Sequence, residues 1–259
     1  MAEKVDILGV NVSRLDLEET IERMSSAIDH KERLRIAVTP VNCLLWARKN
    51  PSLRHIYNTA DIVAADGVPV VWASRLCGYT INGRVTGLDL LPRFAETAAQ
   101  KGYSFFFLGA AAGVAELLAA GLMKKNPGLK IAGTYSPPYA ESFSLEENDK
   151  MIELINDSGA DVLWVSLTAP KQDFWIAEHF ARLQTKIAVG VGAAFDVVAG
   201  KVPRAPVWMQ RSGFEWFFRL MQEPGRLASR YLIEAPVFFP LILKQAIQTR
   251  FSKHVRKEG

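Results

Sequence analysis

The chain has 259 residues, 49% of them hydrophobic, which is enough to bury a large core as one α/β domain with an appendage or as two small domains. The two cysteines, Cys43 and Cys77, lack CxxC spacing and the four histidines are scattered, so a disulfide framework and a metal centre are disfavoured. The net charge of +4 is asymmetric, because residues 201–259 carry eleven Lys and Arg against four acids. No export signal opens the chain, and we expect a cytoplasmic protein whose basic C-terminus meets an anionic partner.

Short apolar runs alternate with helical patterns along the chain. Strands are predicted at residues 5–12 (a strand or a hairpin), 34–39, 61–66, 104–108, 129–135, 161–167 and 186–191. Helices are predicted at residues 16–29, 42–49, 51–60, 68–77, 88–100, 109–125, 145–156 and 170–183. Strands separated by single helices imply right-handed crossovers. Residues 1–200 are therefore predicted to form one Rossmann-like α/β domain with a mostly parallel sheet flanked by helices.

Asp66 ends the apolar run of residues 61–66 and is followed by Gly67. In a parallel sheet the carboxyl ends of the strands open onto the ligand crevice, so a carboxylate there faces substrate. The alternative is that Asp66 caps the next helix. Thr39 and Asn42 flank Pro40 at the end of the strand 34–39 and would reach the same crevice if the two strands are neighbours. We expect Asp66 to be a catalytic group and Thr39 and Asn42 to orient the reacting groups.

Glycines at two further strand ends are candidates for close approach to a nucleotide. Gly109 follows the phenylalanine-rich strand, where small residues either bring a helix N-terminus to phosphate or permit tight packing. Gly192 belongs to a GxG, but Phe195 stands where a dinucleotide fingerprint requires Gly or Ala. No GxxxxGK[ST] occurs, so NAD and P-loop ATP chemistry are both disfavoured.

Polar residues at the remaining strand ends complete the candidate donor site. Asp196 is a candidate acceptor for ribose hydroxyls or a helix cap. Lys171 and Gln172 lie at the start of a helix, where Lys171 would suit a bound anion or be simply solvated. Tyr135, at the end of the strand 129–135, is also placed with the donor.

The C-terminal residues 201–259 mix aromatic side chains with arginines, including Arg219, Arg226 and Arg230. Such a mixture is typical of single-stranded nucleic-acid binding or of a membrane interface, and an ordinary helix pair packed on the domain is a third interpretation. The apolar run 232–243 favours lipid and is too short to span a bilayer. We expect a membrane-docking appendage and no nucleic-acid partner.

Six stretches, taken in order along nearly the whole chain, resemble the WecG/TagA/CpsF family of bacterial glycosyltransferases. They are residues 65–72 (ADGVPVVW), 84–90 (RVTGLDL), 106–109 (FFLG), 169–172 (APKQ), 190–196 (GVGAAFD) and 204–206 (RAP) continuing to 215–216 (EW) and 223–227 (EPGRL). The combination is specific, although each stretch alone is weak.

The resemblance implies a metal-independent, inverting transfer, without a cofactor, of an N-acetylmannosamine-type sugar from a UDP donor to N-acetylglucosamine on undecaprenyl diphosphate. It implies Asp66 as the base, Asp196 and Gln172 near UDP, and an appendage that docks on the inner face of the cell membrane and binds diphosphate. The chain has no DxD, which agrees with a diphosphate charge met by Arg84 and the C-terminal arginines. Two departures from the family pattern are Ser166, where Gly is expected, and Ser229, where a second arginine is expected beside Arg230.

Three questions stay open at this level. The donor is UDP-ManNAc, its uronic acid or UDP-glucose. Self-association into a homo-oligomer would be one way to hide the apolar C-terminus in solution. The rival function is a non-catalytic nucleotide-binding module recruited to a membrane by its tail; an oxidoreductase is disfavoured by Phe195.

Overall fold

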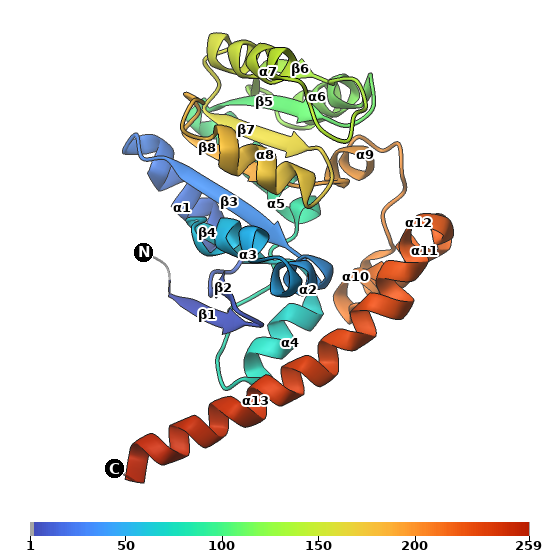
Figure 1. Ribbon diagram of the computed structural model, residues 1–259. Coiled ribbons are helices and arrows are strands. Elements are labelled where there is room, and N and C mark those ends of the chain that lie inside the picture. The colour runs from blue at the N-terminus through green and yellow to red at the C-terminus, as the bar shows by residue number, and fades with distance from the viewer. Residues whose placement is uncertain (1–2, 259) are drawn as a thin grey trace.

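The computed structural model describes residues 3–258, without the side chains of Arg211, Arg226 and residues 251–258. Its centre is a six-stranded sheet in which every neighbouring pair is parallel and the spatial order is β4-β3-β8-β7-β5-β6 (Figure 1). The strands are β3 (Leu34–Thr39), β4 (Ile62–Ala65), β5 (Ser104–Gly109), β6 (Lys130–Tyr135), β7 (Val162–Ser166) and β8 (Ile187–Gly190). The predicted Rossmann-like fold with helices around a parallel sheet is confirmed.

Helices cover both faces of the sheet, because its central strands are apolar on both sides. Strand β5 shows the alternation: Phe105 and Phe107 belong to the core on one face, and Phe106 belongs to the core on the other. The first face carries α1 (Leu17–Asp29), α5 (Gly87–Lys101), α6 (Val114–Lys125) and α9 (Ala194–Val198). The second carries α3 (Pro51–Asn58), α7 (Leu145–Asp157) and α8 (Lys171–His179).

A third apolar cluster covers β3 and β4 on the second face of the sheet, where Ala37 and Val63 pack with residues of the N-terminus and of α13 (Ala235–Glu258). Residues 4–13 form an antiparallel hairpin of β1 (Lys4–Ile7) and β2 (Val10–Ser13), which decides between the two predictions for this stretch. The hairpin packs with α2 (Val41–Lys49) and α4 (Val68–Leu76). Helix α1 begins with a capping box, since Asp16 accepts from the N–H of Glu19 and the Glu19 carboxylate accepts from the N–H of Asp16.

Two predicted helix boundaries were wrong by more than two residues. Helix α6 begins at Val114 and not at Gly109, because Gly109, Ala110 and Gly113 all have positive φ and the chain turns through them. Helix α8 ends at His179 and not at residue 183.

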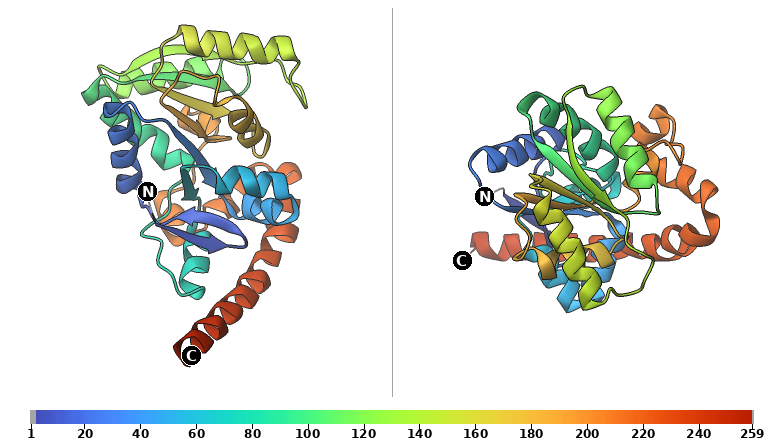
Figure 2. Two further views of the ribbon diagram at one scale, coloured as in Figure 1. Left: turned by 60° about the vertical axis from the view of Figure 1, so that its left-hand side comes forward. Right: turned by 90° about the horizontal axis from the view of Figure 1, so that it is seen from above.

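The chain after α9 leaves the sheet and forms a C-terminal segment, residues 201–258. It contains α10 (Val207–Ser212), α11 (Glu215–Gln222), α12 (Pro224–Ala228), a π-helical stretch η1 (Ser229–Glu234) and α13 (Ala235–Glu258). In Figure 1 the strand arrows point toward the side of the molecule where α9 to α12 lie, and α13 runs back beneath α4 and the hairpin (Figures 1 and 2). Helices α10 to α12 therefore lie on the side of the carboxyl ends of the strands, and α13 extends away from it (Figure 1).

One stripe of α13 is buried and another is exposed. Phe238, Ile242 and Ala246, spaced four residues apart, pack into the third cluster, and the Gln245 side chain bonds to the hairpin at Leu8 and Asp6. Large apolar side chains of the same helix are exposed to solvent: Val237, Phe239, Leu243 and Ile247. Within residues 3–258 no helix combines the length and the apolar character that crossing a membrane requires.

Candidate active site

Asp66 lies directly after the last residue of β4. The predicted neighbours are adjacent: Thr39 of β3 pairs with Ala65, and the N–H of Asp66 donates to the Thr39 carbonyl at 3.3 Å. The alternative that Asp66 caps α4 is wrong, because the N-cap is Gly67, with φ +101°, and no side chain caps that helix. The carboxylate of Asp66 is thus not used by the helix that follows it.

The surroundings of Asp66 make it a stronger base than an ordinary aspartate. Burial raises the pKa of Asp66 to about 7. The nearby charges partly cancel: Arg219 and Arg84 favour the ionised form, and Glu215 and Asp89 oppose it. A carboxyl that titrates near neutral pH suits general base catalysis.

Thr39 lies next to Asp66 in the fold and Asn42 follows at the start of α2, but both are buried. The Thr39 hydroxyl donates to the Ala37 carbonyl at 3.3 Å. Asn42 is in the first turn of α2, and its amide lies 3.7 Å from the sulfur of Cys43. The structure brings both residues to the end of β3, as expected, and their contact with substrate stays a proposal.

The ends of β7 and β8 are joined through Gly192. The side-chain oxygen of Gln172 accepts from the Gly192 N–H at 2.9 Å, and the Ser166 hydroxyl donates to the Gly192 carbonyl at 2.7 Å. Gln172 is buried, and a Cβ at Gly190 would lie 2.8 Å from its amide nitrogen. Glycine at 190 therefore makes room for Gln172, and the unusual Ser166 has a definite partner.

Gly109 is required by close packing. Its φ is +103°, and a Cβ there would lie 2.4 Å from the carbonyl oxygen of Ser166 on the neighbouring strand. This favours the packing interpretation of Gly109. Because glycine has no side chain, the backbone at the carboxyl ends of β5 and β7 is also left uncovered there.

The other residues predicted to bind the donor substrate are Tyr135, Lys171 and Asp196. The Tyr135 hydroxyl donates to Glu147 at 2.8 Å. Lys171 donates to the Ala140 carbonyl and lies 3.7 Å above the Phe143 ring, so its ammonium already has partners within the chain. Asp196 is inside α9, whose N-cap is Ala193, and it caps nothing.

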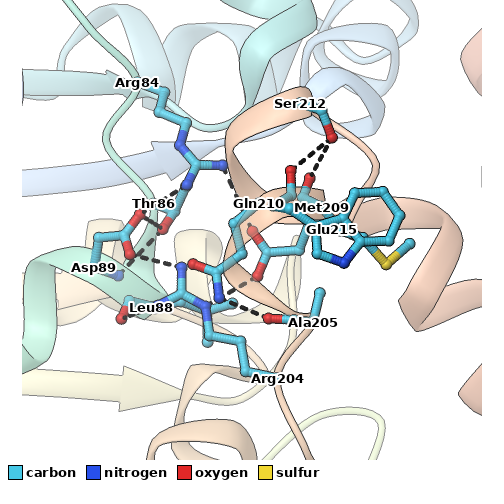
Figure 3. A network of polar contacts seen from close by, with 11 residues as sticks. Arg84, Thr86, Leu88, Asp89, Arg204, Ala205, Met209, Gln210, Ser212 and Glu215 are labelled. Carbon is cyan, nitrogen blue, oxygen red and sulfur yellow. Dashed lines mark hydrogen bonds and ion pairs between the residues drawn. The ribbon is translucent and has the colours of Figure 1, made fainter.

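Arg84 belongs to a closed ring of four charged side chains (Figure 3). Arg84 lies 3.5 Å from both Asp89 and Glu215, and Arg204 lies 2.6 Å from Asp89 and 3.0 Å from Glu215. We call these four residues the charge ring. Asp89, Arg204 and Glu215 were not among the predicted site residues, although all three lie in the stretches that carry the family resemblance.

The C-terminal arginines are in different situations. Arg219 of α11 acts on Asp66 and forms no ion pair with the other described side chains. The guanidinium of Arg230 lies 5.2 Å from the centre of the Trp46 ring. The side chain of Arg226 lies outside the described part of the structure. Among the described residues, no three His, Cys, Asp or Glu side chains are grouped so as to hold a metal ion.

Comparison with known proteins gives a consistent result. A family model described as "Glycosyl transferase WecG/TagA/CpsF family" matches residues 5–252. Three similar proteins carry the name N-acetylglucosaminyldiphosphoundecaprenol N-acetyl-beta-D-mannosaminyltransferase. They come from Bacillus spizizenii strain W23 (33% identity, 76% of this chain and 74% of that one), Bacillus subtilis strain 168 (28%, 84% and 82%) and Staphylococcus aureus strain MRSA252 (25%, 93% and 92%).

Proposed function

The chain belongs to the WecG/TagA/CpsF family of glycosyltransferases, and on that basis we propose that it moves an N-acetylmannosamine-type sugar from a UDP donor to N-acetylglucosamine on undecaprenyl diphosphate. The names of the similar proteins support this acceptor and this sugar. Such a step belongs to wall teichoic acid or related surface-polysaccharide synthesis.

The proposal rests on Asp66, a partly buried carboxyl group at the end of a strand that no helix uses as a cap. Asp66 takes the proton of the acceptor hydroxyl while that oxygen attacks the anomeric carbon of the donor. The bond from the anomeric carbon to the diphosphate breaks, and UDP leaves from the opposite face with the bonding electron pair. One displacement inverts the anomeric centre.

The sheet order supports a donor site on the same edge of the sheet as Asp66. The connections of β5 and β7 lead in opposite directions, to β6 and to β8, and the crevice at such a point is where open α/β sheets bind ligands. Gly109, Gln172 and Gly192 are at that edge, with Asp196 just beyond. Since neighbouring strands lie about 4.8 Å apart, β4 and β7 are three spacings, or about 14 Å, apart, which suits a nucleotide between β7 and β5 whose sugar diphosphate extends along the edge toward Asp66.

The charge of the departing diphosphate is offset by arginine and backbone N–H groups, without a metal ion. Arg219 is the best placed of the predicted arginines, because it acts on Asp66 and has no ion-pair partner among the described side chains. Arg84 is held in the charge ring, so we assign it to orienting the groups around Asp66 rather than to binding the diphosphate.

The C-terminal segment brings the enzyme to the inner face of the membrane, where the lipid-linked acceptor is found. Exposed apolar side chains recur along it, among them Trp208, Phe217, Phe239 and Leu243, and its sequence is basic. We treat residues 1–200 as the catalytic part and residues 201–259 as this docking part.

A direct assay tests the function. The full chain is incubated with UDP-ManNAc and a lipid diphosphate-linked GlcNAc, and released UDP and the disaccharide product are measured, with UDP-glucose and UDP-GlcNAc as competing donors. Transfer should rise with pH through a midpoint near 7, as Asp66 ionises. Binding of UDP without sugar transfer to any acceptor would instead indicate the non-catalytic module.

A further inference from the structure

We propose that the charge ring is a latch that holds helix α11 across the carboxyl end of β4, so that Asp89, Arg204 and Glu215 are positioning residues for Asp66. The inference rests on the proposed function in one respect, because it takes Asp66 as the base.

The ring joins two parts of the molecule that are distant in sequence. Arg84 and Asp89 come from the start of α5 and the loop before it, and Arg204 and Glu215 come from the C-terminal segment. Charges alternate around the ring, so each acid lies between two guanidinium groups. Two of the four links, Arg204 to Asp89 and Arg84 to Glu215, cross between the parts.

The ring side chains are mostly withdrawn from water, with exposed fractions of 13% for Glu215 and 23–26% for the other three. Ion pairs on an open surface contribute little, but removing one member of a partly buried set leaves its partners without compensation. Arg204 also donates to the Leu88 carbonyl at 3.4 Å, and the Thr86 hydroxyl donates to Asp89 at 2.9 Å. The four groups are therefore held in one arrangement.

A separate contact places the C-terminal segment against the chain next to Asp66. Gly213, in the turn between α10 and α11, lies so near the start of α4 that a Cβ there would be 3.6 Å from the Cβ of Val68. Val68 is two residues after Asp66. The ring and this turn together fix the position of α11 relative to β4.

The latch determines what surrounds the Asp66 carboxylate. The charged and titratable groups that face it are Arg84 and Asp89 from the α5 side, Glu215 and Arg219 from α11, and the Cys43 thiol from α2. Glu215 and Arg219 act there only while α11 is in place. Arg204 forms its ion pairs with Asp89 and Glu215 rather than acting on Asp66 directly. Its replacement therefore tests the position of α11 rather than a direct charge effect on Asp66.

The test compares Arg204→Gln and Arg204→Lys with Arg93→Gln in the full chain. Arg93 is the control because it lies on α5, as Asp89 of the charge ring does, but its ion pairs are with Glu18 of α1 and Glu96 of α5, within the main body. Hydrogen exchange of residues 207–222 reports docking of α11. The pKa of Asp66, from its carboxyl carbon-13 shift, and the split between kcat and donor KM report the consequence at the site.

Arg204→Gln should speed hydrogen exchange of residues 207–222 at least tenfold, while the exchange rates of the sheet stay as in the wild type. It should also lower the pKa of Asp66 by about one unit, because water then reaches the carboxyl group. It should lower kcat about tenfold with donor KM within about twofold. Arg204→Lys keeps the charge but not the planar fork, so it should recover part of each effect. Arg93→Gln should behave as wild type.

Unchanged exchange and an unchanged Asp66 pKa in Arg204→Gln would overturn the latch, even if the wild type transfers sugar. If the wild type transfers no sugar at all, the proposed function fails, whereas the exchange and carbon-13 measurements still decide the latch. Should Arg204→Gln not fold, Glu215→Gln is assessed by the same exchange measurement, where protection equal to wild type would count against the proposal.

Discussion

The backbone N–H of Asp66 donates to the backbone carbonyl of Thr39 at 3.3 Å. This bond extends the β3–β4 ladder one residue beyond its last strand pair, Thr39 opposite Ala65. The Cα of Asp66 is therefore held by the sheet, and Gly67, with φ +101°, turns the chain away immediately afterwards. A catalytic carboxylate on a rigid strand end is positioned more accurately than one on a free loop.

Replacing Asp66 with Asn should lower kcat by about 10²- to 10⁴-fold, because the amide is nearly isosteric but cannot accept the proton. The measurement is initial-rate UDP release with saturating donor and acceptor. The matched control is Asp61→Asn. Asp61 directly precedes β4, at the end of the strand opposite to Asp66, so its replacement should change kcat less than about twofold. Near-native turnover of a folded Asp66→Asn protein would exclude Asp66 as the base.

Asp66→Asn should also raise the free energy of unfolding at neutral and higher pH. Burial raises the pKa of Asp66 from 3.8 to about 7, so between these values the folded state binds more protons than the unfolded state, and the free energy of unfolding falls as pH rises. Asp66→Asn removes this penalty. Urea denaturation should show a gain on the order of 2 kcal/mol at pH 8 that shrinks toward pH 5. A gain that is equal at both pH values would contradict this assignment.

Gly109→Ala should destabilise the protein by about 2 kcal/mol or more, since φ is +103° and the new Cβ would lie 2.4 Å from the Ser166 carbonyl oxygen. Gly121→Ala is the control. Gly121 is in α6 and a Cβ there meets nothing within 4 Å, so this change should stabilise by about 0.5–1 kcal/mol. Both are measured by urea denaturation, and destabilisation of equal size in the two variants would show that the Ser166 contact is not the cause.

Vesicle binding should depend on the exposed stripe of α13. Phe239 and Leu243 are 51% and 57% exposed, so Phe239→Glu with Leu243→Glu costs little folding free energy but adds two negative charges to the proposed lipid-facing surface. Flotation with anionic vesicles should fall at least tenfold. The control pair, Leu117→Glu with Met123→Glu, is similarly exposed on α6 and should float as wild type does. If both pairs float equally well, α13 does not contact the lipid.

The amino-acid sequence by itself determined the α/β class, the order of strands and helices and the strand-end position of Asp66. These features arise from residues close together in the chain, where the alternation of apolar and polar positions reflects which side of a strand or helix is buried. The three consecutive phenylalanines of β5 show the other pattern, an unbroken apolar run, because that strand is buried on both faces.

Only the tertiary structure decided which side chains meet Asp66 and which arginines remain free. Arg84 was expected to face a diphosphate but lies in the charge ring, and Arg204 finds Asp89 across 115 positions of sequence. Lys171 likewise contacts Ala140 and Phe143. The sequence around a charged residue does not indicate which distant residue it will pair with, because ion pairs form between whichever charged groups the fold brings within a few ångströms. The strength of each pair depends on how much water the fold excludes from it.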